Sequence, residues 1–305
     1  MKLNTRLFFL HARTSIHVGS GRGTGAIDLP IARQKSTGLP VIPSTGIKGV
    51  WRDAASKWNL EPQQVAALYG PAQDNKDQGE GRGMLSPQDA RLLALPVASM
   101  TGGWLWVSSP FLLSWLKREA RACLPNSSLP DRLPDRLPDP KDDDVCLADE
   151  SIAFNVGEDR YVVLHDQVLK TAKMKGNTEL VKDWAGYISS LVFEPLDDWR
   201  KIFVQRFAVV SDEAMHYFSQ YATEDQARVT LDENRVAVGT GLWREESLPM
   251  ETILFGVVGT EYRKNSCYEN DEDLLNAIPV LCDLQIGGKA STGKGIVSMR
   301  CVRPK

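Results

Sequence analysis

Hydrophobic residues near the two ends of the chain predict a β-strand at each end. Leu7, Phe9 and Ile16 are interspersed with polar residues in a segment, 3–17, that is rich in β-branched and aromatic side chains. An apolar run at 295–302 has the same character and is the last predicted strand. Shorter strand-like segments lie between them, at 84–95, 152–156, 161–164, 203–210, 235–243 and 252–258.

Helical spacing of apolar residues is found in four segments. The serine of a Pro-Ser pair at 43–44 is the expected N-cap of a helix that runs to about residue 58. A Glu-Pro pair opens a short helix at 61–70, and a Ser-Pro pair opens an amphipathic helix at 109–123. The fourth pattern covers 180–191. Many strands with few helices indicate an α+β fold.

A ferredoxin-like β-α-β-β-α-β unit accommodates a strand at each end of the chain. Its first and last strands can lie close together in one sheet. The two ends of the chain would then share one face, and sheets of this type bind single-stranded RNA.

A length of 305 residues suits one large domain with insertions or two small domains, and we expect a single domain over 1–305. The polar, Gly-rich residues 71–83 predict an exposed loop. Residues 125–144 contain the repeat LPDR-LPDR-LPDP, which predicts a flexible, polyproline-like spacer insertion. Deleting 130–140 is therefore expected to leave folding nearly intact.

Charge is distributed unevenly along the chain. Residues 1–52 carry a net charge of +7 and residues 284–305 carry +5, whereas the whole chain is at −3, so 53–283 carry −15. If the fold brings the ends together, they form one positive surface that suits a phosphate chain. Asp28, the one acidic residue among the first 52, would lie inside that surface.

Composition argues against several other classes of protein. The sequence has no apolar run near 18 residues, and its N-terminal apolar stretch is too short for a signal peptide. Five cysteines without a CxxC pattern indicate reduced thiols rather than a zinc site or a disulfide framework. A pI near 5.9 argues against a basic protein that coats nucleic acid unaided. The expected location is the cytoplasm, with no membrane partner.

Glycines are concentrated in two basic segments, 17–52 and 286–297. Glycine lets the backbone approach a ligand closely, and the interleaved Lys and Arg favour a phosphate ligand. Neither segment matches a nucleotide-binding motif. Gly295 follows Lys294 where a P-loop has Ser or Thr, and 19–25 lacks the spacing G-x-G-x-x-G.

These segments and two further blocks form an ordered set of motifs over nearly the whole chain. The blocks are His17-x-Gly19-x-Gly21, Ile27-Asp28-x-Pro30-Ile31-x-Arg33, Pro40-x-Ile42-Pro43 with Lys48-Gly49-x-x-Arg52, Leu95-Pro96-Val97 with Trp104 and Ser108-Ser109-Pro110, Gly241-Leu242-Trp243-x-Glu245-Glu246-x-Leu248-Pro249-x-Glu251-Thr252, and Ile286-Gly287-Gly288 with Thr292-Gly293-Lys294-Gly295. The set resembles the RAMP superfamily, the repeat-associated proteins of CRISPR systems. Within it, the resemblance is to the repeated backbone subunit of the type III-B (Cmr) RNA-guided effector complex. Arg244 stands where that resemblance leads us to expect an aromatic residue.

The resemblance implies a fold, a set of partners and an activity. The fold would be a ferredoxin-like, RRM-like RAMP palm with inserted finger and thumb segments. Copies of the chain would assemble side by side along a CRISPR RNA guide, together with other subunits. Each copy would act as an endoribonuclease on guide-paired target RNA, in a reaction that depends on a loosely bound divalent metal, Mg²⁺ or Mn²⁺.

Asp28 is the expected catalytic residue. A carboxylate among phosphates weakens RNA binding unless it has another task, such as accepting the proton of a ribose 2′-OH or anchoring a hydrated metal ion. A turn cap or an ion pair with Arg33 is the alternative, and spacing alone leaves both open. The resemblance favours catalysis and implies supporting roles for His17, Glu245 and Glu246. For the two glutamates, ordinary packing at a strand edge is the alternative.

A larger set of residues is expected to contact RNA. Lys48 and Arg52 lie four apart on one helix face, near the free N–H groups of the helix start, and so suit an anion. Gly288 and Gly293 are expected to adopt conformations that disfavour a Cβ atom; a plain turn is the alternative. The full set is His17, Arg22, Lys48, Arg52, Trp243, Gly287, Gly288, Lys289, Gly293 and Lys294.

Two other functions stay open on the sequence. One is a purely structural RNA-binding subunit without catalysis. The other is a nuclease that processes the guide precursor. That nuclease would need histidines paired as acid and base, and the four histidines are scattered.

Overall fold

The computed structural model describes residues 4–71, 82–124, 132–172, 177–264 and 266–303. Within these residues the chain has a mixed α+β fold, as the sequence predicts. Most of the predicted loop at 71–83 lies outside the described residues, as does the first part of the predicted spacer. None of the described helices combines the length and apolar character that a membrane crossing requires.

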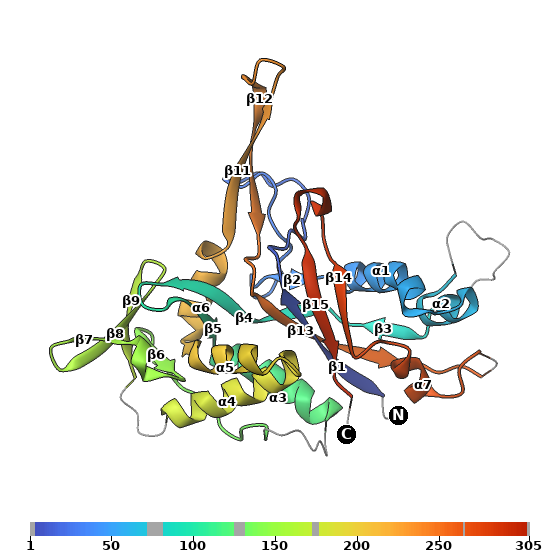
Figure 1. Cartoon of the computed structure of the whole chain (residues 1–305), viewed down its shortest axis with the longest axis horizontal. Helices are drawn as coiled ribbons and strands as arrows, with labels where there is room; N and C mark the ends of the chain where they lie inside the picture. Colours follow the sequence, from blue (N-terminus) through green and yellow to red (C-terminus); the bar gives the residue numbers. More distant parts are fainter. Residues whose placement is uncertain (1–3, 72–81, 125–131, 173–176, 265, 304–305) are drawn as a thin grey trace.

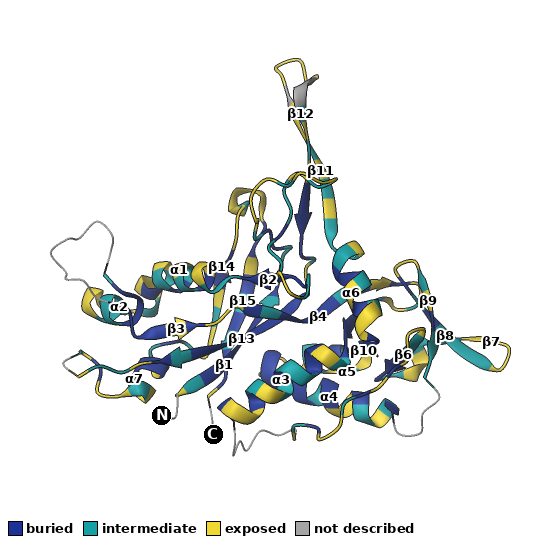
Figure 2. Ribbon diagram, turned by 180° about the vertical axis from the view of Figure 1, so that it is seen from behind, coloured by how far each residue is buried: buried dark blue, intermediate teal, exposed yellow. Residues whose placement is uncertain are grey.

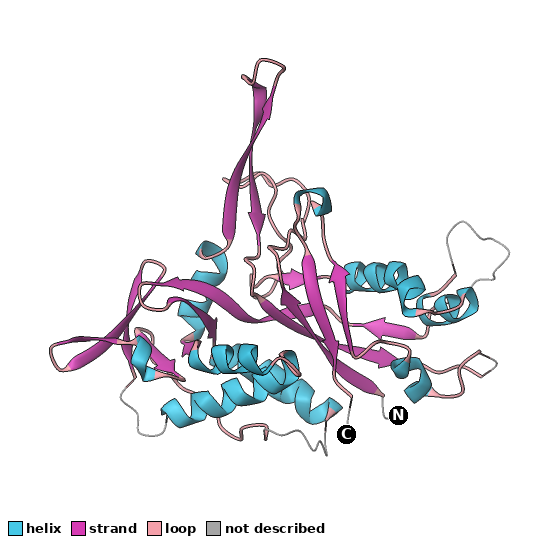
Figure 3. Ribbon diagram, viewed as in Figure 1, coloured by secondary structure: helices cyan, strands magenta, loops and turns pink. Residues whose placement is uncertain are grey.

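Strands dominate the fold, and the longer helices are grouped on two sides of the sheet (Figure 3). The described α-helices are α1 (Ser44–Ala54), α2 (Pro62–Tyr69), α3 (Pro110–Cys123), α4 (Asn177–Val192), α5 (Asp197–Gln205), α6 (Asp212–Tyr221) and α7 (Asp271–Asn276). The described strands are β1 (Thr5–Ala12), β2 (Val41–Ile42), β3 (Leu85–Pro87), β4 (Ala90–Ser99), β5 (Gly103–Ser108), β6 (Asp144–Leu147), β7 (Phe154–Val156), β8 (Asp159–Leu164), β9 (Gln167–Thr171), β10 (Phe207–Val210), β11 (Glu224–Leu231), β12 (Ala237–Ser247), β13 (Ile253–Thr260), β14 (Leu281–Gln285) and β15 (Ile296–Cys301).

All but two of these described strands belong to one continuous sheet (Figure 1). Its order is β14-β15-β1-β13-β4-β5-β10-β6-β9-β8-β7, with β2 beside β4 and β3 beside β13. β8 also pairs with β4 at Ser99 and Leu164, so the strands from β4 to β8 close into a barrel-like ring. The other two, β11 and β12, form an antiparallel ribbon that projects from the body of the molecule (Figure 1).

β1 lies inside the sheet and has an antiparallel neighbour on each side, β13 and β15. The prediction that the first and last strands lie close together is therefore confirmed. Alternate side chains of β1 enter two cores. Phe8 meets Trp51 of α1 edge-on in one core, whereas Leu7 and Phe9 face a second core that contains side chains of α3 and α4. Both faces of the central strands are thus buried (Figure 2).

The predicted helices at 61–70 and 109–123 form with the expected start signals. Gln64 accepts a hydrogen bond from the N–H of Glu61 at the start of α2, and Ser109 is the N-cap of α3. Ser44, by contrast, is the first residue of α1 rather than its cap. Its N–H donates to the carboxylate of Asp89, 2.8 Å away. A partner distant in sequence therefore satisfies the helix start.

The segment predicted as a strand at 203–210 divides into the end of α5 and the strand β10. Asp197 and Asp198 favour a helix start at α5, which then buries Phe203. The hydrophobic pattern also fails to predict α6, β11 and β14. In β14, for example, burial alternates along the strand, but the apolar Leu281 lies on the exposed face and Leu284 alone is buried, so the sequence shows no alternation of apolar and polar residues.

The described part of the predicted spacer, 132–144, packs against the body of the protein. Three of its prolines are buried, and Leu133 and Leu137 contact the core beneath α3 and α4. Trp184 of α4 donates its Nε1–H to the carbonyl oxygen of Arg136, at 2.8 Å. A flexible, solvated spacer would make none of these contacts, so the predicted flexibility does not hold for this part.

Candidate nucleic-acid interface

Segments from both ends of the chain meet at the base of the β11–β12 ribbon. Ile16 and Leu248 form a backbone bridge just beyond the end of β12. The next residue, His17, accepts a hydrogen bond at its carbonyl oxygen from the N–H of Gly288, at 2.9 Å. The expectation that the two glycine-rich segments lie together is therefore confirmed.

Asp28 lies exposed beside β12, on a segment that is fixed to that strand. Its Oδ2 accepts a hydrogen bond from the backbone N–H of Arg244, at 2.8 Å. The next residue, Leu29, pairs with β12 through both of its backbone groups. Its N–H donates to the carbonyl oxygen of Arg244, and its carbonyl oxygen accepts from the N–H of Glu246, each at 3.0 Å. The ion pair with Arg33, which was the alternative for Asp28, does not form. Arg33 pairs with Glu246 instead.

His17 is anchored to the same stretch of β12. The side chain is buried, and its Nδ1 lies 2.6 Å from the carbonyl oxygen of Glu246. Because a carbonyl only accepts, Nδ1 must carry the proton, which leaves Nε2 of a neutral ring as a hydrogen-bond acceptor. The groups that anchor Asp28 and His17 belong to Arg244 and Glu246, residues two apart on β12 whose Cα atoms are therefore about 7 Å apart.

The side chain of Glu246 binds the segment that follows Asp28. This side chain is buried, and Oε2 accepts from the N–H of Ile31 at 3.0 Å. Oε1 binds the guanidinium of Arg33 and the hydroxyl of Thr223, the latter at 3.0 Å. Both carboxylate oxygens are thus occupied by protein groups, which favours a positioning role for Glu246. Nothing in the local sequence points to Thr223, which lies 23 residues away in the chain.

Glu245 is bound by the two lysines of the C-terminal loop. Its buried carboxylate lies 3.2 Å from Nζ of Lys289 and 3.1 Å from Nζ of Lys294. Burial by itself raises the pKa of Glu245, but hydrogen bonds and charge from Lys294 and Lys289 outweigh it and hold the pKa below its ordinary value. Lys294 is buried and also donates to the hydroxyl of Ser247, so its ammonium group is bound within the protein and does not face solvent.

The C-terminal loop approaches the His17 backbone at Gly287. Gly287 has φ +85°, and a Cβ at this position would lie 2.4 Å from the carbonyl oxygen of His17. Gly293 has φ +81°, as expected. The expectation for Gly288 is wrong, because its Cβ would meet its nearest neighbour at an ordinary 3.7 Å. The close approach falls one residue earlier than the motif suggests.

A cluster of cations surrounds the exposed face of α1. Lys48 and Arg52 share this face, and Arg82, which follows the polar loop, is close enough to act on Lys48. Burial, and then the charges of Arg82 and Arg52, lower the pKa of Lys48. Such mutual repulsion is relieved by an anion. The sequence does not reveal Arg82, which lies 30 residues from Arg52. Arg22 is exposed on the loop that precedes Asp28.

Trp243 and Arg244 lie at the base of the ribbon. Trp243 is half-buried, and its buried Nε1–H has no hydrogen-bond partner among the described residues. Arg244 binds Asp225 of β11 across the ribbon, with Nε 3.2 Å from Oδ1. An ion pair therefore stands where the motif led us to expect an aromatic ring.

The acidic residues of this region do not form a preformed metal centre. Within the described residues no group of three or more His, Cys, Asp or Glu side chains is arranged to hold a metal ion. Glu245 and Glu246 are engaged by lysine and arginine. Asp225 is likewise paired with Arg244, so Asp28 is the one acid among these four that has no cationic partner within the described residues.

The fold and this interface belong to a defined class of protein. The model of the RAMP superfamily matches residues 9–298, and the chain is a member of that superfamily. Among curated relatives, it is similar to the "CRISPR system Cmr endoribonuclease Cmr4" of Pyrococcus furiosus, with 27% identity over 95% of this chain and 93% of that protein. It is also similar to the "CRISPR system CMR subunit Cmr4" of Saccharolobus solfataricus, with 23% identity over 96% and 95%.

Solved structures share the fold over almost the full length. A crystal structure of oligomeric Cmr4 from Pyrococcus furiosus superposes with a TM-score of 0.70 at 22% identity, and covers 98% of both chains. A chain of the type III-B Cmr-beta complex bound to cognate target RNA gives a TM-score of 0.70 at 19% identity, over 97% of this chain and 96% of that one.

Proposed function

We propose that this chain is a CRISPR RNA-binding backbone subunit of a type III-B effector complex, and that it cuts target RNA paired with the guide. The proposal rests on the full-length similarity to a Cmr endoribonuclease together with one observation. Of the acids at the interface, Asp28 alone is exposed without a cationic partner among the described residues, and it is held beside β12 by hydrogen bonds to the backbone of that strand. In this proposal copies of the chain line up along one guide in the cytoplasm, with other subunits of the complex. We further infer that β15, β1, β13 and β4 correspond to a ferredoxin-like palm.

Asp28 has the position and chemistry of a general base. Its Oδ2 is held by Arg244, and the other oxygen is free to accept a proton from a ribose 2′-OH. The 2′-oxygen then attacks the adjacent phosphorus, the bond to the 5′-oxygen breaks, and that oxygen takes a proton from solvent. The reaction cuts RNA and leaves DNA intact because DNA has no 2′-OH.

The other residues predicted to contact RNA fall into two groups, those with exposed side chains and those that would contact RNA mainly through the loop backbone. Arg22, Lys48, Arg52 and the half-exposed Trp243 are placed to bind the RNA backbone and bases, with Arg82 as an addition. The backbone at Gly287, Gly288 and Gly293, with His17 and Lys289, would line the path of the guide. Lys294 supports that path through Glu245.

A divalent ion, Mg²⁺ or Mn²⁺, remains part of the proposal only as a loosely held partner. Asp28 offers one carboxylate, and Mg²⁺ commonly keeps several waters and takes further ligands from substrate phosphates. The protein residues alone do not make a metal site, so no step is assigned to the ion.

Replacing Asp28 by Asn tests the enzyme against the purely structural subunit. The Asp28→Asn variant, assembled with guide, should bind target RNA as tightly as the unmodified protein, while cleavage falls by about 10²-fold or more. A target with one 2′-deoxyribose at the cut position should resist the unmodified protein. Full cleavage by the variant would make Asp28 a turn residue, and loss of guide binding would show that its role is structural.

A further inference from the structure

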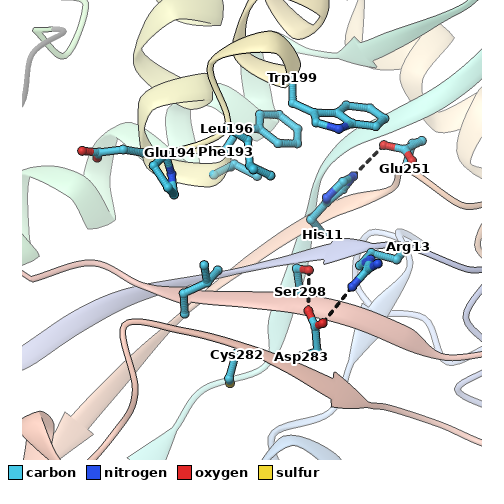
Figure 4. A pocket seen from close by; sticks show the side chains of 13 residues that line it. His11, Arg13, Phe193, Glu194, Leu196, Trp199, Glu251, Cys282, Asp283 and Ser298 are labelled. Carbon is cyan, nitrogen blue, oxygen red and sulfur yellow. Dashed lines mark hydrogen bonds and ion pairs between the residues drawn. The ribbon is translucent and has the colours of Figure 1, made fainter.

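A cavity of about 750 Å³ lies at the β14 edge of the sheet, and none of its lining residues belongs to the interface described above (Figure 4). Its floor is a row of polar side chains across neighbouring strands, with His11 on β1 opposite Ser298 on β15, and Ser298 opposite Asp283 on β14. The corner between α4 and α5 covers this floor. This size is typical of ligand pockets in proteins.

The roof of the cavity is aromatic. Phe193 and Trp199 lie nearly parallel, with an interplanar angle of 19° and ring centroids 6.1 Å apart. The His11 ring meets both of them edge-on, at 5.0 Å and 6.0 Å. Leu196 extends the apolar surface toward solvent, where it is 54% exposed. A ligand group that enters here is flanked by aromatic faces on one side and polar atoms on the other.

One carboxylate at the cavity, that of Glu251, is not paired with a lysine or an arginine. Asp283 is bound by Arg13 at 2.7 Å, and Glu194 is bound by Arg300 at 2.7 Å. Within the described residues the side-chain partner of Glu251 is His11, with Nε2 and Oε2 2.6 Å apart. Glu251 also holds φ +71°, an unfavourable conformation for a non-glycine residue.

The strand that borders the cavity has a free edge. Val280 accepts from the N–H of Cys301, and the N–H of Ile286 donates to Gly295, so the even-numbered residues of this segment bond to β15. In an antiparallel pair the backbone groups alternate, so those of Leu281 and Asp283 point outward. Among the described strands β15 is the sole neighbour of β14. Leu281 is 52% exposed at this edge.

We propose that β14 and this cavity form a docking site for an extended protein segment that carries an arginine. The segment adds to the free edge as a further strand, and the arginine side chain enters the cavity. Strand addition obtains affinity from backbone hydrogen bonds and specificity from a pocket for alternate side chains. The side chains of Leu281 and Asp283 line this pocket, so a residue paired opposite them points into it.

Arginine fits the cavity better than other side chains. Its planar guanidinium stacks on the Trp199 ring, and its five donors supply the Glu251 carboxylate with a full charge. Its aliphatic stem covers the Leu196 side of the opening. A purely apolar side chain would leave Glu251 to the imidazole of His11. A nucleotide would bring its phosphates to a floor whose carboxylates, Asp283, Glu194 and Glu251, outnumber its arginine.

Short synthetic peptides test the proposal on the full-length protein. The probe is acetyl-Thr-Val-Arg-Val-Thr-amide, added antiparallel to β14. Its matched controls replace arginine by citrulline, which has the same shape without charge, or N-methylate the two threonines, whose N–H groups face β14 as that of the arginine does. Titration followed by Trp fluorescence and calorimetry should give saturable binding. The citrulline peptide should bind about tenfold more weakly or worse, and N-methylation should abolish binding because it removes the strand hydrogen bonds.

Variants of the protein locate the site. Glu251→Gln should remove the preference for arginine over citrulline, and Trp199→Leu should weaken binding of the arginine peptide by about tenfold. If self-association of the chain is competed by the peptide, the site is supported and the natural segment is that of a second copy. No binding up to about 1 mM, or equal binding of the arginine, citrulline and N-methylated peptides, would overturn the proposal. So would a nucleotide that saturates the cavity while the peptide does not. None of these outcomes bears on RNA cleavage at Asp28.

Discussion

At the scale of single residues, the three acids predicted for the site differ in what surrounds them. Glu245 and Glu246 are buried and bound by cations, whereas Asp28 is exposed and holds one backbone N–H. The sequence singles out Asp28 because it is an acid among bases. It does not separate the glutamates, since their partners Lys289 and Arg33 lie tens to hundreds of residues from them. Identifying such pairs requires the tertiary fold.

The pH dependence of stability should report the state of Glu245. Because its folded pKa is depressed below the ordinary value of 4.5, its ion pairs stabilise the fold above that pH and are lost as the pH falls through the folded pKa. Glu245→Gln should therefore lower the free energy of unfolding by about 1–3 kcal/mol at neutral pH, and the difference should shrink in acid. Urea unfolding at pH 7 and at pH 3–4 measures this.

The exposed Glu233, at the tip of the ribbon, offers a matched control. Glu233→Gln removes the same charge from solvent and should leave the unfolding midpoint unchanged at both pH values. Equal destabilisation by the two variants would show that net charge, rather than the lysine pairs, is responsible.

At the scale of elements, the sequence predicts the starts that local signals encode and misses the elements that depend on contacts distant in sequence. The start signals of α2 and α3 lie within four residues of the helices they open, so the sequence contains them in full. The first N–H of α1 is bound by Asp89, which is distant in sequence, and β14 is a strand because it pairs with β15. Neither element is therefore marked by a pattern in its own sequence. The spacer cannot be predicted from local sequence for the same reason. Its prolines indicate a stiff backbone, but they do not indicate what that backbone packs against.

Deleting residues 132–140 should destabilise the protein, contrary to what the repeat alone suggests. The deletion removes Leu133 and Leu137 from the core surface, and leaves Nε1 of Trp184 without the Arg136 carbonyl. We expect the melting temperature to fall by several degrees, since each kcal/mol shifts it by about 2–4 °C in a chain of this size class. Calorimetry measures this, and an unchanged transition would show that these contacts contribute nothing.

The C-terminal loop should tolerate a side chain at Gly288 but not at Gly287. Gly287→Val places atoms against the His17 carbonyl and forces an L-residue to φ +85°, so it should displace the loop and reduce guide affinity by about tenfold or more. Gly288→Ala meets only ordinary contacts and is the matched control. Filter binding of guide RNA compares them. Equal affinity for both variants would mean that the loop does not shape the RNA path.

At the scale of the whole molecule, the basic ends are less basic at the surface than their sequence suggests. Arg6, Arg13, Arg33 and Arg300 are all paired with carboxylates of the same chain, as are the two lysines of the C-terminal loop. Among the described residues of the N-terminal segment, the cations without a carboxylate partner are Arg22 before Asp28, Lys35 after it, and Lys48 and Arg52 on α1. Counting charges along the chain therefore overestimates the electrostatic surface.

The salt dependence of guide binding should reveal how many cations contact phosphate. Lys48→Ala and Arg52→Ala should each weaken binding regardless of guide sequence, and should each reduce the slope of log K against log salt by about 0.7. Arg13→Ala, which breaks a surface pair with Asp283, should leave the slope unchanged. Unchanged slopes for the α1 variants would remove α1 from the RNA path.

The position of β1 has a consequence for how the protein is made. Phe9, near the start of the chain, pairs with Phe255 on one side and Arg300 on the other, so the first strand synthesised is among the last to find its partners. At about 5–20 residues per second, β1 waits about 15–60 s on the ribosome with both edges unpaired. Such apolar strands are prone to aggregation. A ribosome that stops short of β15 therefore releases a chain whose central sheet cannot close, and expression should depend strongly on chaperones that shield nascent strands.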